Sequence, residues 1–151
     1  MIFYKIPIIE KIYEAYSAIA DGRIKKQQDV YLIESSNYTK TYTILCENDT
    51  YISNDNMSYW NQTIGYPIIA VMMIEGKITY NKEVCEKFKN IDWKKINTEY
   101  KNDYVKAAAV VLENLKAAGE DIDLIKLETE KVYSQVQKLK LAYNKSKIKL
   151  A

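Results

Sequence analysis

Residues 53–73, SNDNMSYWNQTIGYPIIAVMM, place a polar segment rich in asparagine directly before a long apolar run. The apolar run starts at Pro67, and only Glu75 interrupts it before Gly76. Proline fits the first turn of a helix and glycine commonly ends one, so the run favours a short core helix over its alternative, a buried strand. The polar segment, residues 54–66, is expected to be a loop.

Short strands are expected before this segment. Their sequences are rich in β-branched and aromatic residues, and polar turns separate them, which is typical of an antiparallel meander. The three predicted strands cover residues 30–34, 40–47 and 50–53.

Helices are expected on both sides of this region. From Ile8 to Ala20 apolar residues recur at helical spacing, and Gly22 is the expected stop. After Asn81 the chain is highly charged, and helical periodicity runs from residue 92 to Gly119 and again after a cap at Asp121 or Asp123. Two long helices joined at a glycine predict a helical hairpin.

The predicted fold class is therefore α+β. It consists of an N-terminal helix, a three-stranded antiparallel meander and a short core helix, followed by a C-terminal helical hairpin. We divide the chain into residues 1–80, the α+β part, and residues 81–151, the helical hairpin with a basic C-terminus. The two parts are expected to form one compact unit or two closely packed ones.

Composition excludes several chemistries. The 151 residues include no histidine, so a Ser-His-Asp triad, a Cys-His pair and an imidazole metal site are all impossible. The two cysteines, Cys46 and Cys85, lie in different predicted elements, and free thiols are favoured over a disulfide. Four glycines cannot form a phosphate-binding loop. We expect no catalytic residues, no metal and no cofactor, and we interpret Glu120, Asp121 and Asp123 as helix caps rather than ligands of a divalent ion.

The sequence also predicts a location. The chain meets a charge within its first few residues, and its longest uncharged run contains Asn, Gln, Ser and Thr, so we expect neither a signal peptide nor a membrane span. A cytoplasmic protein is predicted. Many Ile, Lys, Glu and Tyr residues with few Gly and Pro fit an organism that lives at high temperature.

The strand YTILCENDTYISND and the apolar PIIAVMM segment together resemble a SWIM-type zinc finger over residues 30–76. That family has Cys-x-Cys where this chain has Ser53 and Asp55, and Cys-x-His where it has Gly65 and Pro67. The resemblance therefore implies a SWIM-like module without zinc, in which aromatic packing replaces the metal. The residues expected to do so are Tyr59, Trp60 and Tyr66, with Trp60 packed where the metal would lie. The alternative is a generic meander with a core helix.

A basic C-terminus is the second functional signal. From Lys131 to Ala151 the chain has six lysines and no acidic residue. Such a run suits the phosphates of RNA or DNA, although a solvated helix end would also explain it, and the net charge of +2 is weak by itself. The candidate nucleic-acid-binding residues are Lys131, Lys138, Lys140, Lys145, Lys147, Lys149 and Arg23.

The sequence thus predicts a non-catalytic cytoplasmic protein that binds nucleic acid or a ribonucleoprotein through a basic C-terminal helix. The loop aromatics Tyr59, Trp60 and Tyr66 are expected to assist by stacking on bases or anchoring a partner. The alternative is a protein-binding or structural subunit, such as a viral or mobile-element protein acting on a host machine. Its partner would be another protein or a second copy of the chain, with no direct nucleic-acid contact and no membrane.

Overall fold

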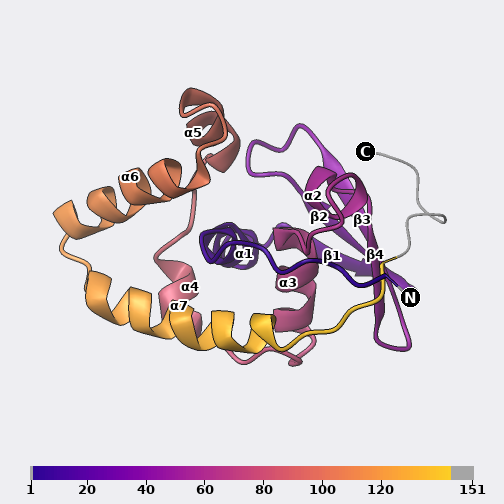
Figure 1. The fold of residues 1–151 in the computed structure, drawn as a ribbon. Coiled ribbons are helices and arrows are strands. Elements are labelled where there is room, and N and C mark those ends of the chain that lie inside the picture. The colour runs from indigo at the N-terminus through magenta and orange to yellow at the C-terminus, as the bar shows by residue number, and fades with distance from the viewer. Residues whose placement is uncertain (1, 144–151) are drawn as a thin grey trace.

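The structure, a computed structural model, describes residues 2–143. It is an α+β fold in which an N-terminal helix is followed by an antiparallel sheet and then by further helices (Figure 1). In chain order the elements are α1 (Lys11–Ala20), β1 (Ile24–Gln27), β2 (Val30–Glu34), β3 (Thr41–Glu47), β4 (Thr50–Ser53), α2 (Asn56–Tyr59), α3 (Tyr66–Ile74), α4 (Lys82–Glu86), α5 (Trp93–Glu99), α6 (Tyr104–Ala117) and α7 (Ile122–Gln137).

The sheet has one strand more than predicted. Its four strands lie in the order β1-β2-β3-β4, and each pairs antiparallel with the next. Sequence analysis missed β1 because its sequence, IKKQ, lacks apolar alternation and its last three residues are exposed. The strand forms because its backbone pairs with β2, from Ile24 opposite Ile33 to Gln27 opposite Val30. An edge strand with exposed lysines is a common way to end a sheet.

The predicted core helix is present. It is α3, and its residues 67–73 are all buried. Gly76 follows it with a positive φ of 77°, as expected for a glycine that ends a helix. The helices α1 and α3 lie side by side between the sheet and the helices α4, α6 and α7 (Figure 1). Burying each large apolar side chain of α3 contributes about 1.5–3 kcal/mol, so this helix stabilises the N-terminal half.

The charged C-terminal half differs from the prediction in two places. The helix expected from residue 92 to Gly119 is broken into α5 and α6, because Lys101 and Asn102 adopt positive φ angles of 52° and 63° and Asp103 then caps α6. Helix α7 is capped by Asp121, one of the two predicted candidates, but it ends at Gln137. The residues after it are therefore not helical up to Tyr143.

One hydrophobic core runs through both halves. It includes Tyr13 and Tyr16 of α1, Phe88 after α4, and Val132 of α7. The rings of Tyr13 and Phe88 stack with centroids 5.2 Å apart, and the Tyr16 hydroxyl lies 3.1 Å from that of Thr129. The division at residue 80 stays a prediction, and side chains from both sides of it pack together.

Candidate functional site

The polar segment before α3 folds around a buried carboxylate. Residues 54–66, predicted as loop, contain the short helix α2, and Asp55 caps it by accepting a hydrogen bond from the Ser58 backbone N–H at 3.1 Å. The Ser53 hydroxyl donates to the other oxygen of Asp55. The Gly65 N–H donates to the Ser58 hydroxyl oxygen at 3.1 Å. These four residues, which we call the Asp55 cluster, join three of the positions that align with zinc ligands in the SWIM resemblance.

The Asp55 cluster is closely packed and buried. A Cβ atom on Gly65 would overlap Oδ2 of Asp55, and it would lie 2.9 Å from the Asp55 Cγ and 3.0 Å from the Ser58 Oγ. Burial raises the pKa of Asp55 above its usual range, although its hydrogen bonds to Ser53 and Ser58 act in the opposite direction. Within residues 2–143, no three His, Cys, Asp or Glu side chains are grouped as ligands for a metal ion.

The expectation that Trp60 fills the place of the metal is wrong. Ser58 and Gly65 close around Asp55, and the Trp60 side chain at the end of α2 is 59% exposed. Its ring meets that of Tyr59 edge to face, with centroids 5.0 Å apart. Tyr66 does not join them, because it begins α3 and lies beside the buried Arg23, and burial raises its pKa.

The two ends of the described chain meet beside this loop. Phe3 pairs antiparallel with Ala142, and Lys5 pairs parallel with Thr63. Backbone hydrogen bonds from Tyr4 N–H to Leu141 O, at 2.9 Å, and from Lys5 N–H to Gln62 O, at 2.7 Å, hold the three segments together. The result is a short three-segment ribbon, residues 62–64, 3–5 and 141–143, which no sequence periodicity indicated.

Side chains attach the ribbon to the aromatic loop. The Tyr143 hydroxyl donates to the Tyr59 carbonyl at 2.6 Å, and the Tyr143 ring packs edge-on against Tyr4 at 5.3 Å. Tyr4 itself is buried and donates to the Tyr51 carbonyl at 2.9 Å. In extended chain successive side chains point to opposite faces, so Phe3 and Lys5 lie on the outer face, where both are exposed.

We call the outer side of this ribbon and its adjoining loop the terminal surface. Its exposed members are Phe3, Lys5, Trp60 and Lys140. None of the three contributing stretches, residues 2–9, 56–66 and 138–143, contains an aspartate or glutamate. The terminal surface is therefore aromatic and apolar with only positive formal charges in the segments that build it.

The structure separates the predicted basic residues. Lys131 lies on α7 and pairs with Glu128 at 3.2 Å, whereas Lys138 caps the end of that helix and Lys140 follows it. The predicted basic C-terminal helix is therefore wrong. Of the described lysines in this run, only Lys131 lies within α7. Lys145, Lys147 and Lys149 lie outside the described residues.

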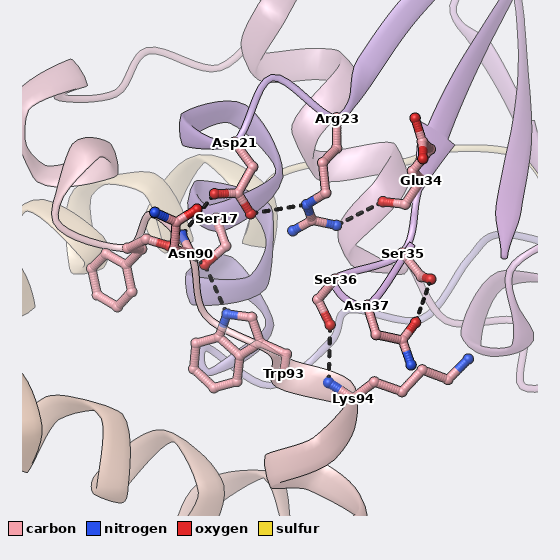
Figure 2. Close-up of polar contacts among 11 residues, drawn as sticks. Ser17, Asp21, Arg23, Glu34, Ser35, Ser36, Asn37, Asn90, Trp93 and Lys94 are labelled. Atoms are coloured by element: carbon pink, nitrogen blue, oxygen red, sulfur yellow. Dashed lines mark hydrogen bonds and ion pairs between the residues drawn. The ribbon is translucent and has the colours of Figure 1, made fainter. Parts of the chain in front are cut away.

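Arg23 is not a surface residue. Its guanidinium donates to Asp21 at 3.1 Å and to the Glu34 carbonyl at 2.7 Å (Figure 2). Its side chain is 1% exposed, so it is out of reach of a phosphate. Arg23 was predicted to bind nucleic acid, and its burial corrects that prediction. Its actual role is to join the end of α1 to β2.

The acidic residues between α6 and α7 have structural partners. Asp121 caps α7 by accepting from the Leu124 N–H at 3.1 Å, which confirms the cap interpretation for this residue. Glu120 pairs with Lys87 at 2.9 Å, and Asp123 lies in the first turn of α7.

Both cysteines are free, as favoured from the sequence. Cys85 is buried and Cys46 is partly buried, and burial raises the pKa of each thiol to about 12. Across residues 2–143, none of the helices has the length and apolar character needed to cross a bilayer.

A polar cleft is a further feature that the sequence did not indicate. It encloses about 350 Å³ and is lined by residues of α1, α2, α5 and the loop before β3. Two of its lining residues, Lys11 and Glu14, are buried charges that pair at 2.9 Å. A charged pair three residues apart is common on exposed helix faces, so its sequence spacing gave no indication of a cleft.

Comparison with known proteins gave one match. The sequence matches the family described as "Uncharacterised conserved protein UCP014422" over residues 4–142. A search of curated proteins and a search of solved structures returned no match.

Proposed function

We propose that the chain, which belongs to the family Uncharacterised conserved protein UCP014422, binds single-stranded nucleic acid through its terminal surface. The supporting observation is the hydrogen bond from Tyr143 to the Tyr59 carbonyl, which brings the aromatic loop next to residues 138–143, the described end of the lysine run. Proteins that bind single strands combine aromatic side chains, on which bases stack, with a positively charged path for the backbone. Trp60 offers the first, and Lys5 and Lys140 offer the second.

The Asp55 cluster has a supporting role in this proposal. It fixes both ends of the segment that carries Tyr59 and Trp60, since Asp55 caps α2 and Gly65 begins α3. We regard it as the replacement for zinc in a SWIM-like module, because hydrogen bonds to one buried carboxyl can hold a loop as metal ligands do. A rigid loop presents Trp60 at a low entropic cost of binding.

The proposed role is non-catalytic and cytoplasmic. The histidine-free composition supports the first point, since it removes the usual general base. Free, unreactive thiols support the second, because cysteines stay reduced in the cytosol.

Trp60 provides the test, because the chain has only two tryptophans and the other, Trp93, is 3% exposed. Titrating a short single-stranded oligonucleotide at low salt should quench the fluorescence of Trp60. Replacing Trp60 with alanine should weaken binding by about 5- to 150-fold, from a stacking contribution of about 1–3 kcal/mol. An unquenched Trp60 at low salt would refute the proposal.

The charge contribution has its own test. Removing Lys5 and Lys140 together should weaken binding to all sequences and reduce the slope of log K against log salt by about 1–2. Removing Lys89 and Lys116, which are exposed lysines outside the terminal surface, is the matched control. Equal losses from the two double variants would show that net charge, rather than this surface, is responsible.

A protein partner is the second candidate, and one observation favours it. Ile2 and Phe3 are 61% and 48% exposed at the N-terminal end of the ribbon, and a protein interface would bury such side chains. Light scattering over a range of concentrations, together with pull-down by the purified chain, tests this role. Self-association or capture of one protein that Trp60→Ala abolishes, without oligonucleotide binding, would favour it over nucleic acid.

A further inference from the structure

A groove runs between α6 and α7, which we call the α6–α7 groove. The two helices diverge from the turn that joins them, and the start of α1 lies between their far ends (Figure 1). The groove consists of two cavities of about 430 and 300 Å³, and Ala109, Leu112 and Lys126 line both of them. It shares no lining residue with the polar cleft or the terminal surface.

The floor of the α6–α7 groove is apolar and partly exposed. Val105, Ala109 and Leu112 lie four and three residues apart on α6, so they share one face of that helix. Val105 is 56% exposed, Ala109 is exposed and Leu112 is half-buried. Ile9 and Ile122, which extend the floor, are also half-buried. Apolar side chains left open along a groove are typical of a surface that another molecule covers.

Carboxylates dominate the walls of the groove. The lining has six acidic residues, which are Glu10, Glu113, Glu120, Asp121, Asp123 and Glu130. Among residues 2–143 Glu120 pairs with Lys87, and the other five form no ion pair. The lining holds two lysines, Lys116 and Lys126, so negative charge is in excess.

Two of these carboxylates lie near Tyr13. Burial is the main reason that the pKa of Tyr13 is raised to about 12, and the charges of Glu10 and Glu130 raise it further. Glu10 precedes α1 and Glu130 lies on α7, so carboxylates from two elements meet at this part of the groove. A lysine or arginine from a bound molecule would be attracted to both.

We propose that the α6–α7 groove binds a basic amphipathic helix of another protein. The apolar face of such a helix would cover the floor, as in other helix-in-groove complexes, and its flanking cations would pair with the carboxylates of the walls. The rise along α6 from Val105 to Lys116 is about 16 Å, which accommodates about three turns of a bound helix. The same carboxylates repel nucleic acid and anionic lipid, so the charge of the groove favours a protein as its occupant.

Fluorescence anisotropy with a labelled synthetic peptide tests the proposal. The probe is an 18-residue peptide of leucine and lysine in which the leucines recur at helical spacing, and it should bind at low salt with a Kd below about 100 μM. Two control peptides should each bind at least about tenfold more weakly. One has glutamate in place of lysine, and the other has the same composition in an order without helical periodicity.

A blocking substitution assigns the binding to the groove. Ala109→Arg places a long cationic side chain on the floor and should weaken peptide binding about tenfold or more. Asn114→Arg adds the same side chain to an exposed position of α6 outside the groove, and its Kd should stay within about twofold of the original. Thermal melts check the folding of both variants. Val105→Arg repeats the test at the other exposed position of the floor.

A charge variant tests the walls. Replacing Glu113 and Glu130 together with glutamine should weaken peptide binding about 2- to 30-fold and reduce its dependence on salt, since each exposed ion pair contributes about 0.2–1 kcal/mol. The matched control replaces Glu47 and Glu86, which are exposed and lie outside the groove. Equal losses from the two double variants would show that net charge alone attracts the peptide.

Other outcomes also count against the groove. Absence of binding at low salt, equal binding of the lysine and glutamate peptides, or unchanged binding in Ala109→Arg would overturn the proposal. If the peptide does not bind and light scattering shows self-association that Ala109→Arg abolishes, the occupant is a second copy of the chain instead.

This proposal and the nucleic-acid proposal fail independently. Trp60→Ala should leave the Kd for the peptide unchanged, and Ala109→Arg should bind oligonucleotides as Asn114→Arg does. If Trp60→Ala abolishes peptide binding, the peptide is bound at the terminal surface and the groove assignment is wrong.

Discussion

Replacing Gly65 with alanine should destabilise the protein through a single contact. The new Cβ would overlap Oδ2 of Asp55, and neither side can move freely, because Asp55 is held by Ser53 and Ser58. Gly65 has a φ of −85°, which any residue adopts, so backbone strain does not contribute. The effect of the substitution is therefore one of packing.

The magnitude follows from two opposing contributions. Inserting one carbon into a tightly packed interior costs about 1–3 kcal/mol. Alanine also restricts the unfolded chain more than glycine does. At a position whose φ suits alanine, this stabilises the folded protein by about 0.4–1 kcal/mol. Because the new Cβ overlaps a carboxyl group that is held in place, we expect a packing cost in the upper half of its range, about 2–3 kcal/mol. The net loss in the free energy of unfolding is then about 1–2.5 kcal/mol, which corresponds to a fall in Tm of about 2–10 °C for a protein of this size.

A double-mutant cycle identifies the contact. Urea unfolding is measured for the original chain, Gly65→Ala, Asp55→Ser and the double variant. Serine keeps an oxygen that can cap α2 but lacks Oδ2, with which the new Cβ would overlap. The losses in stability of the two single variants should therefore sum to more than the loss of the double variant. Strict additivity, or a Gly65→Ala protein as stable as the original, would refute the packing argument.

Three further predictions concern ionisation and exposure. The pKa of Asp55 is raised in the folded state, so Asp55 holds its proton more tightly in the folded protein than in the unfolded chain. The stability of the original chain relative to Asp55→Asn should therefore decrease as the pH rises from the unfolded-state pKa through the folded-state pKa. Urea unfolding at several pH values measures this difference. Cys46 and Cys85, with pKa values of about 12, should react with a thiol reagent at pH 8 far more slowly in the folded protein than in urea, and fast labelling of both in the folded state would contradict this. Iodide should quench the fluorescence of Trp60 but not that of Trp93, so Trp60→Phe should remove nearly all the quenchable emission.

Local patterns predicted the elements whose own residues determine them. The apolar run at residues 67–73 is stable as a buried helix, and the glycine that follows it marks the end of that helix. The cap at Asp121 was also predictable, because its carboxylate oxygen accepts a hydrogen bond from a backbone N–H only three residues further along the chain. Strand β1 was not predictable, because its polar residues are stabilised by backbone pairing with the neighbouring strand rather than by burial of their own side chains.

The candidate sites depend on contacts between distant parts of the chain, and sequence periodicity does not contain these. The SWIM resemblance, which stays a prediction, aligned Ser53, Asp55, Gly65 and Pro67 with zinc ligands. In the structure three of these residues, Ser53, Asp55 and Gly65, lie together around the Asp55 carboxyl group. Trp60 was misplaced because serine hydroxyls, which gave no signal in the sequence, complete the hydrogen bonds of Asp55. The cleft was missed because Lys94 and Glu14 look like ordinary surface charges until tertiary packing partly buries them.

The three-segment ribbon has a consequence for the order of folding. Phe3 pairs with Ala142, and Lys5 with Thr63, so the ribbon requires the closure of long loops of chain before its first hydrogen bond forms. Contacts between residues so distant in sequence form slowly, and the sheet and helices, whose partners are nearer, should form first. During synthesis the N-terminal segment cannot complete its pairing until residues 141–143 have left the ribosome. The terminal surface is thus assembled only when the folding of the described chain is complete, and a partner that binds it would distinguish finished molecules from partly folded ones.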